Sequence, residues 1–433
     1  MVKVASTFFV QNFGCRASQA DGAAIESALA RRGFVSTGEI EQAELVILNT
    51  CTVTSTADED LRQAVRRVCR TNPGARILVT GCYAQRAPDE VAALPGVSWV
   101  VGNSHKTSIP DLLTAPDLDY HGFVRVGDIF AQRDFLAAPV EDAAGDRTRP
   151  NLKIQDGCPN RCSFCIIPFV RGHSRSAPAD DVVAQIRALS ARYREVVLSG
   201  INLGRWGREP GSRIRLPDLL RRILAETEIE RLRLSSVEPM DFSDDLLGLM
   251  AESPRIAKHV HAPLQSGCDT VLRRMRRKYR PRHYEDRVRR ARALMPEAAI
   301  GADVMVGFPG ETDEEFEESR RFIESLPFNY LHVFTYSERP GTPAAEAGDQ
   351  IPMRLRKERN RVLRELAAQK NLEFRRSFVG RRLSVVTLEQ GALSDNFVRV
   401  ELAQARAANQ IVEIEIGATT ATGLREAAAF NIL

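Results

Sequence analysis

Short apolar runs alternate with amphipathic stretches through the first 140 residues. The apolar runs predict strands, and the stretches between them, with apolar residues at helical spacing, predict helices. This alternation is typical of a parallel sheet covered by helices. The expected strands are residues 7–12, 45–49, 76–80 and 99–102, and the expected helices are residues 18–31 and 58–70.

The middle of the chain repeats the same strand–helix pattern more regularly. One of its helices is expected to begin at a capping box, Thr312 followed by Glu315. Six parallel β/α units predict a full or partial TIM-like barrel, with its chemistry on the loops at the carboxyl ends of the strands. The expected strands are residues 152–155, 195–199, 231–237, 258–264, 300–306 and 330–336.

The last part of the chain changes character after a basic helical stretch at 354–374. Residues 383–388, 396–402 and 411–416 alternate like short antiparallel strands. They predict a small all-β module, which is either an oligonucleotide-binding type of barrel or a structural cap on the larger domain. The predicted α/β chain thus divides into an N-terminal parallel α/β domain (1–140), a polar linker (141–150), a (β/α)6 barrel domain with a helical extension (151–375) and the all-β domain (376–433).

Composition narrows the class of protein. A content of 43% hydrophobic and 27% charged residues is typical of a globular protein. It shows neither a run of about 20 apolar residues that would span a membrane nor a signal-peptide core, so we expect a cytoplasmic protein. In that compartment the eight cysteines suit metal ligation or burial better than disulfides. The net charge is only +4, but basic runs at 273–282 and 354–364 are either phosphate-binding clusters or solvated helix faces.

Three cysteines form a C-x₃-C-x₂-C motif directly after the strand expected at 152–155. Cys158, Cys162 and Cys165 can hold three corners of a four-iron cluster and leave the fourth iron open to a small molecule. The alternative is a structural zinc site, which prefers four ligands and would need His173 as the fourth. The spacing favours the iron–sulfur cluster.

A second set of cysteines is dispersed in sequence but shares one context. Cys15, Cys51 and Cys82 each follow an expected strand of the first domain. The carboxyl ends of parallel strands converge on one crevice, and Gly14 and Gly81 allow a close backbone approach to a ligand there. The set predicts a second four-iron cluster with an open position, the alternative being three small buried residues.

The other cysteines and several histidines favour structural roles. Cys69 on an expected helix is predicted to pack in the core, and Cys268 to pack or line a pocket. His259, His261 and His332 alternate with apolar residues in expected strands and read as hydrogen-bonded histidines. His261 is the strongest candidate for a role in the site because it ends a barrel strand.

These motifs together resemble the radical S-adenosylmethionine methylthiotransferases over essentially the whole chain. Two three-cysteine sets in one chain make the resemblance specific. The matching segments are FGC (13–15), NTCTVT (49–54), TGCYAQ (80–85), QDGCPNRCSFCIIP (155–168), RGHSRS (171–176), LSGINLG (198–204), SSVEP (235–239), HAPLQSG (261–267), RRMRRKY (273–279) and GADVMVGFPGET (301–312).

Within the family, NTCTVTSTAD and KIQDGC…RGHSRS are most similar to the branch that acts on N6-threonylcarbamoyladenosine in tRNA. The branches acting on isopentenyladenosine and on an aspartate of a ribosomal protein are weaker matches. Ser18 departs from the family pattern, which often has Asn in this C-x-x-N context.

The resemblance implies two [4Fe-4S] clusters, S-adenosylmethionine and a C-terminal RNA-binding domain of the TRAM type. Cys158, Cys162 and Cys165 would hold the cluster that binds S-adenosylmethionine, and Cys15, Cys51 and Cys82 the auxiliary cluster. Implied partners are the tRNA anticodon loop, where position 37 is methylthiolated, and a reductant such as flavodoxin or ferredoxin, with the sulfur donor unspecified. The competing class is a non-catalytic iron–sulfur protein that binds RNA or transfers electrons. Residues expected near S-adenosylmethionine from their positions are Gly200, Asn202, Glu238, Gln265 and Asp303.

Overall fold

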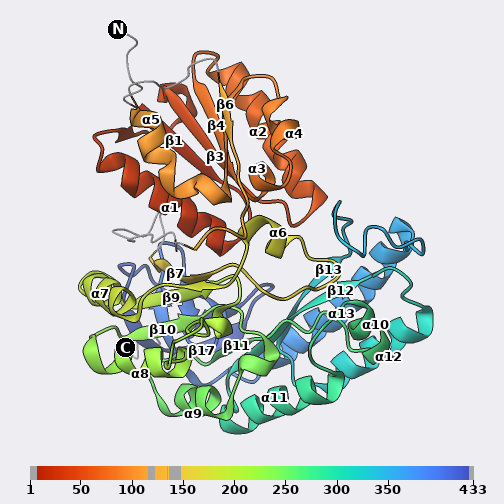
Figure 1. The fold of residues 1–433 in the computed structure, drawn as a ribbon. Helices are drawn as coiled ribbons and strands as arrows, with labels where there is room; N and C mark the ends of the chain where they lie inside the picture. The colour runs from red at the N-terminus through yellow and green to blue at the C-terminus, as the bar shows by residue number, and fades with distance from the viewer. Residues whose placement is uncertain (1–6, 116–121, 134, 136–147, 429–433) are drawn as a thin grey trace. The chain divides into compact units, whose positions relative to one another are not determined.

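The computed structural model describes residues 7–115, 122–133, 135 and 148–428 (Figure 1). It divides the chain into two compact units. The first unit contains residues 1–141, 152–177 and 337–345, and the second contains residues 142–151, 178–336 and 346–433. The cysteines of both predicted sets belong to the first unit.

The first unit contains a parallel six-stranded sheet in the order β2-β1-β3-β4-β5-β6. The four strands expected from the sequence are all present, and two short edge strands were not anticipated. The strands are β1 (Thr7–Asn12), β2 (Val35–Ser36), β3 (Leu45–Thr50), β4 (Arg76–Gly81), β5 (Val97–Gly102) and β6 (Phe123–Arg125).

Helices cover both faces of this sheet. Every residue of the central strand β3 is buried, which explains the apolar run Leu45–Leu48 at its start. Ile25 and Leu29 of α1 pack on one face with Phe8, and Leu61 and Val65 of α2 pack on the other. Figure 1 shows α1 and α5 together on the first face. The helices are α1 (Arg16–Ala30), α2 (Ser55–Thr71), α3 (Cys82–Arg86), α4 (Pro88–Ala92) and α5 (Ile109–Thr114).

Two later segments complete the first unit. Strand β7 (Asn151–Asp156) pairs in antiparallel fashion with β8 (Arg175–Ser176), and the helix α6 (Ile167–Arg171) lies between them in sequence. The segment 337–345 is fixed by Arg339, whose guanidinium donates a 2.7 Å hydrogen bond to the Asp58 carboxylate.

The second unit confirms the expected succession of parallel strands and helices. Strands β9 and β10 pair in parallel, and β11, β12 and β13 form a parallel three-stranded sheet. The helix α12 begins at the predicted capping box, with Thr312 and Glu315 bonding each other's backbone N–H. The strands are β9 (Glu195–Gly200), β10 (Arg231–Leu234), β11 (His259–His261), β12 (Ala299–Val306) and β13 (Tyr330–Thr335). The helices are α7 (Ala179–Ser190), α8 (Leu216–Glu226), α9 (Asp244–Glu252), α10 (Asp269–Arg274), α11 (Pro281–Leu294) and α12 (Asp313–Ser325).

The C-terminal module is a closed five-stranded barrel in the order β14-β15-β16-β18-β17. It follows the long helix α13 (Met353–Arg376) and has its own apolar core around Val385, Val400 and Ile416. The all-β prediction is confirmed, although only three of its strands were anticipated. The strands are β14 (Arg382–Thr387), β15 (Ala392–Ser394), β16 (Arg399–Glu401), β17 (Ile411–Thr419) and β18 (Leu424–Glu426).

This small barrel packs against the amino-terminal ends of the parallel strands. The buried Arg233 guanidinium donates to the Asp395 carbonyl at 2.9 Å and pairs with Glu195 at 2.7 Å. Phe397 stacks on the His259 ring with 4.3 Å between centroids. Phe397 has a φ of 67°, a conformation that costs a bulky residue about 1–3 kcal/mol and persists only where packing enforces it. The barrel therefore seals the end of the strands opposite to their carboxyl ends.

We predict that the second unit loses stability in acid through Glu195. Burial alone would raise the pKa of Glu195, but Arg233, Arg149 and Arg231 lower it to about 2 from an ordinary value of 4.5. The stabilising contribution is therefore complete above about pH 4.5 and is lost as the pH falls toward 2. Glu195→Gln should lower the free energy of unfolding by about 3–5 kcal/mol at pH 7, because it leaves buried Arg233 without its counter-charge.

The measurement is denaturant unfolding between pH 3 and 7, followed by Trp206 fluorescence in a Trp99→Phe background. The difference between Glu195→Gln and its parent should shrink as the pH falls. Glu230→Gln, which removes an exposed partner of Arg194, is the control. A pH-independent difference between variant and parent would contradict the prediction.

Candidate active site

The cysteines of the dispersed set occupy equivalent places on neighbouring strands. Cys15 follows β1 and is the N-cap of α1, Cys51 follows β3, and Cys82 follows β4 as the first residue of α3. Because β1, β3 and β4 are adjacent and parallel, their carboxyl ends share one edge of the sheet.

The thiols of this set lie close enough to influence one another. Burial raises the pKa of the Cys51 thiol to about 12, and the negative forms of Cys82 and Cys15 add to the shift. A Cβ at Gly14, whose φ is 88°, would lie 2.7 Å from the Cys51 sulfur, so only glycine fits beside that thiol. Buried thiols with such a high pKa ionise at neutral pH only when a metal centre binds them.

The cysteines of the clustered set lie on the irregular loop between β7 and α6. Its backbone is held by hydrogen bonds from the Cys158 N–H to the Gly172 carbonyl and from the Cys165 N–H to the Cys162 carbonyl, both 3.1 Å. Gly157 precedes the set with a φ of 72°, and a Cβ there would lie 1.9 Å from a backbone carbonyl oxygen. The imidazole of His173, the fourth ligand of the zinc alternative, packs beside the Phe130 ring at 5.4 Å between centroids.

Side-chain packing connects the loop of the clustered set to the dispersed set inside the first unit. Ile166, the residue after Cys165, and Val170 of α6 form an apolar cluster with Cys82. The Asn103 side-chain amide donates to the Val170 carbonyl at 2.7 Å and to the Cys82 sulfur at 3.6 Å. The two thiol sets are therefore coupled through a few directly packed residues.

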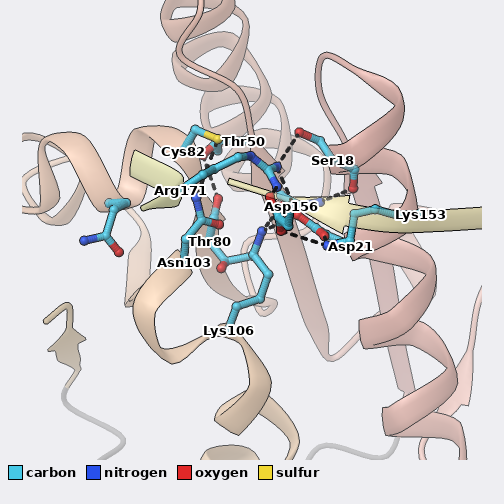
Figure 2. A network of polar contacts seen from close by, with 12 residues as sticks. Ser18, Asp21, Thr50, Thr80, Cys82, Asn103, Lys106, Lys153, Asp156 and Arg171 are labelled. Carbon is cyan, nitrogen blue, oxygen red and sulfur yellow. Dashed lines mark hydrogen bonds and ion pairs between the residues drawn. The ribbon is translucent and has the colours of Figure 1, made fainter. Parts of the chain in front are cut away.

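A network of buried charges lies beside these thiols, as Figure 2 shows. The Asp21 carboxylate accepts hydrogen bonds from Lys106 and Arg171, each at 3.0 Å, and from Lys153. The Asp156 carboxylate accepts from Lys153 and Arg171, each at 2.9 Å. The network joins α1, β7, α6 and the segment after β5, and its five side chains are almost completely withdrawn from solvent.

The ion pairs of this network shift the pKa values of its members. Burial alone would raise the pKa values of both carboxyls, but Lys106, Lys153 and Arg171 hold the pKa of Asp21 well below its ordinary range, and Arg171 and Lys153 do the same for Asp156. Burial alone would lower the pKa of Arg171, but the negative charges of Asp156, Cys82, Asp21 and Cys15 raise it. Burial lowers the pKa of Lys106 despite Asp21, whereas Asp156 and Asp21 raise the pKa of Lys153 against the effect of burial. Both carboxylates, Lys153 and Arg171 are therefore charged at neutral pH.

The sequence analysis did not single out the members of this network. Lys153 lies between Leu152 and Ile154 in a strand that alternates polar and apolar residues, a pattern typical of a half-exposed strand, so the sequence gives no signal that this charge is buried. Asp21 and Lys106 carry no such signal either, because their partners are far away in sequence. Ser18, the noted departure from the family pattern, lies in the same place, with its hydroxyl 3.7 Å from the Cys15 sulfur.

The residues expected near S-adenosylmethionine belong to the second unit. Gly200 ends β9, and Asn202 is buried two residues later. The Glu238 carboxylate accepts a 2.5 Å hydrogen bond from the buried Arg277 guanidinium. Gln265 has a φ of 67°, which is rare for a non-glycine residue, and its N–H donates to the Asp303 carbonyl at 2.8 Å.

Asp303 lies on the inner face of β12 between two histidines. The His261 and His332 rings approach the same carboxylate oxygen at 3.3 and 3.2 Å, and the other His261 ring nitrogen lies 2.6 Å from the Ser236 hydroxyl. Burial alone would raise the pKa of Asp303, but the hydrogen bonds of His261 and His332 lower it. This part of the inner face therefore offers polar groups beside the exposed Phe334 ring.

The two basic runs are only partly available to a phosphate. Arg274 pairs with Glu315, and Arg277 pairs with Glu238. The buried Arg359 pairs with Glu311, and the buried Arg356 donates to the Tyr336 carbonyl. The interpretation of these runs as wholly surface clusters is wrong for these four arginines, which stabilise the fold. Exposed members are Arg273, Arg276, Lys278, Arg282, Arg354, Lys357, Arg361 and Arg364.

Comparison with known proteins places this architecture in one class. Residues 152–323 match the Radical SAM superfamily, and residues 7–102 match the Uncharacterized protein family UPF0004. The solved structure of the radical S-adenosylmethionine methyltransferase TsrM from Kitasatospora setae, with cobalamin and a [4Fe-4S] cluster bound, superimposes with a TM-score of 0.59 at 16% identity, over 78% of this chain and 76% of that one. At that identity the similarity concerns the fold.

Closer relatives define the family. The threonylcarbamoyladenosine tRNA methylthiotransferase MtaB of Bacillus subtilis (strain 168) is 38% identical over 89% of this chain and 85% of its own. The MtaB of Aquifex aeolicus (strain VF5) is 35% identical over 94% and 99%. The tRNA-2-methylthio-N(6)-dimethylallyladenosine synthase of Thermobifida fusca (strain YX) is 35% identical over 92% and 81%. The chain belongs to the radical S-adenosylmethionine methylthiotransferases.

The cofactors of this class are S-adenosylmethionine and [4Fe-4S] clusters, and the donor groups of the first unit fit them. Thiolates are the usual ligands of such clusters, and each set supplies three of them. Across the described ranges, no helix is both long and apolar enough to cross a membrane.

Proposed function

We propose that this transferase adds a methylthio group to C2 of N6-threonylcarbamoyladenosine at position 37 of the tRNA anticodon loop. The carrying observation is that two three-thiol sets fold into one unit and are coupled through Cys82, Ile166 and Val170. The relatives from Bacillus subtilis and Aquifex aeolicus, which are named for this substrate, support the choice of nucleoside.

We assign a separate role to each thiol set. Cys158, Cys162 and Cys165 would hold the cluster that binds S-adenosylmethionine, and the dispersed set would hold the auxiliary cluster that carries the sulfur. When bound, the first cluster and S-adenosylmethionine supply one-electron chemistry that can activate an unreactive C–H bond. Such chemistry suits C2–H of adenine, which is too weakly acidic for a protein base at neutral pH.

Residues of the second unit would position the cofactor and the substrate base. Their places at or near the carboxyl ends of the strands support this proposal. We assign S-adenosylmethionine binding to Gly200, Asn202, Glu238, Gln265 and Asp303. The base must leave its stack to reach a buried site, at a cost of a few kcal/mol.

The remaining partners follow from the same proposal. Exposed arginines and lysines of the basic runs would contact tRNA phosphates without reading sequence. The C-terminal barrel would serve as the TRAM-type RNA-binding domain, with the boundaries 1–140, 151–375 and 376–433 for the three domains. The enzyme would work in the cytoplasm and receive electrons from a flavodoxin or a ferredoxin.

A second candidate substrate is N6-isopentenyladenosine. It is favoured by the relative from Thermobifida fusca, whose name specifies a dimethylallyladenosine product and whose identity to this chain is also 35%. The two candidates share the radical chemistry and differ in the N6 substituent that the site accepts.

Nucleoside mass spectrometry of tRNA from a strain lacking this gene and any paralogue distinguishes the two substrates. We expect 2-methylthio-N6-threonylcarbamoyladenosine to fall below detection and to return when the gene is restored. The 2-methylthio derivative of isopentenyladenosine should be unchanged and serves as the internal control. Loss of the isopentenyl derivative with retention of the threonylcarbamoyl derivative would establish the second candidate instead.

A further inference from the structure

Among the described residues, the buried network beside the dispersed thiol set contains three basic side chains and two carboxylates. Asp21 and Asp156 face Lys106, Lys153 and Arg171, and every one of these side chains is at most 8% exposed. Arg175, only partly buried, adds a further positive charge 4.0 Å from Asp156. A buried charge without a counter-charge is strongly destabilising, so within the described residues this excess of basic side chains favours an anion bound nearby.

Arg171 is the member of the network that reaches toward the thiols. Its guanidinium donates to both carboxylates and lies 3.5 Å from the Ser18 hydroxyl, which is itself 3.7 Å from the Cys15 sulfur. Figure 2 shows Arg171 extended between Cys82 and the two carboxylates. The preceding residue, Val170, packs on Cys82.

The position of Arg171 in the chain links the two thiol sets. It is the last residue of α6, the helix that follows the loop of Cys158, Cys162 and Cys165. Hydrogen bonds from both terminal nitrogens, Nη1 and Nη2, hold the guanidinium in one orientation, so the positive charge has a defined position in the unit. Among the described residues, the thiolates of Cys82 and Cys15 are, together with the two carboxylates, the negative charges that act on its guanidinium.

We propose that Arg171 is a positioning residue that supplies the counter-charge for the anionic sulfur atoms gathered at Cys15, Cys51 and Cys82. It stabilises the negatively charged auxiliary centre and fixes the loop of the clustered set against it. This inference rests on the proposed function, because it takes the dispersed thiols as ligands of a [4Fe-4S] cluster.

The reduction potential of the auxiliary cluster separates this role from a purely structural one. A fixed positive charge favours the reduced, more negative cluster, so its removal shifts the potential to more negative values. If Arg171 only packed against its neighbours, the reduction potential would not depend on whether residue 171 carries a positive charge. The background is the full chain with Cys158→Ala, Cys162→Ala and Cys165→Ala, in which the dispersed set is the remaining cluster site.

Four variants are compared in this background by redox titration monitored with electron paramagnetic resonance. Arg171→Gln removes the charge, and Arg171→Lys retains it. The double variant Arg171→Gln with Asp156→Asn removes one charge of each sign and so preserves the balance of the network if the single variant does not fold. Arg86→Gln is the matched control, because Arg86 lies in the same unit but pairs with Asp58 at 3.1 Å.

We expect a more negative potential for Arg171→Gln and a smaller shift in the same direction for the double variant, because loss of the Asp156 charge acts in the opposite sense. The potential of Arg171→Lys and of Arg86→Gln should lie near that of the background. Equal potentials in the background, Arg171→Gln and the double variant would overturn the role of Arg171. Iron analysis comes first and tests the premise separately: about four irons per chain are expected in the background. A background protein without iron would refute the auxiliary cluster, and with it the proposed function.

Discussion

Replacing Cys51 with alanine should stop methylthio transfer while leaving the cleavage of S-adenosylmethionine intact. Cys51 is buried between Cys15 and Cys82, and its thiol has a pKa of about 12 in the protein without metal. Loss of one of three ligands leaves the auxiliary cluster without a stable site. Cys158, Cys162 and Cys165 keep their backbone hydrogen bonds in this variant, so the first cluster should persist.

The experiment measures two products after anaerobic reconstitution and reduction with dithionite. Formation of 5′-deoxyadenosine should continue in Cys51→Ala, whereas the methylthio nucleoside should fall at least about 100-fold. Iron should fall from about eight to about four per chain. Cys69→Ala, which removes a cysteine bonded to the Pro95 carbonyl outside both sets, is the control and should change neither product.

Two outcomes would contradict this division of labour. Continued methylthio transfer by Cys51→Ala would show that the dispersed set is not the sulfur-carrying site. Absence of 5′-deoxyadenosine from the unsubstituted protein with both clusters assembled would favour the non-catalytic class, an iron–sulfur protein that only binds RNA or transfers electrons.

Replacing Asp21 with asparagine should strongly destabilise the first unit. Asp21 accepts hydrogen bonds from Lys106, Lys153 and Arg171, so its neutralisation leaves three buried cations facing Asp156 alone. Breaking a buried pair in this way costs about 3–5 kcal/mol. Asparagine keeps the size of the side chain, so lost packing contributes little.

The same carboxylate predicts an acid dependence. Lys106, Lys153 and Arg171 lower the pKa of Asp21 below its ordinary value of 3.8 despite the opposing effect of burial. Its contribution to stability is therefore complete above about pH 3.8 and is lost as the pH falls below that value. The difference between Asp21→Asn and its parent should be constant near neutrality and shrink in acid.

Denaturant unfolding followed by Trp99 fluorescence in a Trp206→Phe background reports on the first unit. Both proteins are compared without iron, so that cluster loss does not contribute. Asp111→Asn removes an exposed carboxylate that pairs with Arg32 in the same unit, and should change the free energy of unfolding by less than about 1 kcal/mol. An equally small change for Asp21→Asn would refute the importance of the network.

Much of the fold follows from local sequence. Strand β3 was predictable because it begins with the apolar run LVIL, which is typical of a strand covered on both faces. The start of α12 was predictable because Thr312 and Glu315 satisfy backbone groups within one turn. The short edge strands β2 and β6 were not predicted, because two or three residues are too few to show an alternation of apolar and polar side chains.

By itself the sequence determined the two thiol sets and the order of strands that carries them. Spacing within a loop and position after an apolar strand are local properties, and the rule that parallel strands end at one edge converts them into a site. The sequence also supplied the family resemblance, which the relatives confirm.

Only the tertiary structure decided what surrounds those thiols. Asp21 and Arg171 are 150 positions apart, and Asp21 and Lys106 are 85 apart, so no periodicity relates them. Likewise, the docking of Phe397 on His259 joins residues of different domains. A buried ion pair needs its partners to meet in a place without water, and that is a property of the packed chain. Tertiary packing therefore determines which charged side chains lie beside the cysteines, whereas the positions of the cysteines could be predicted from the sequence.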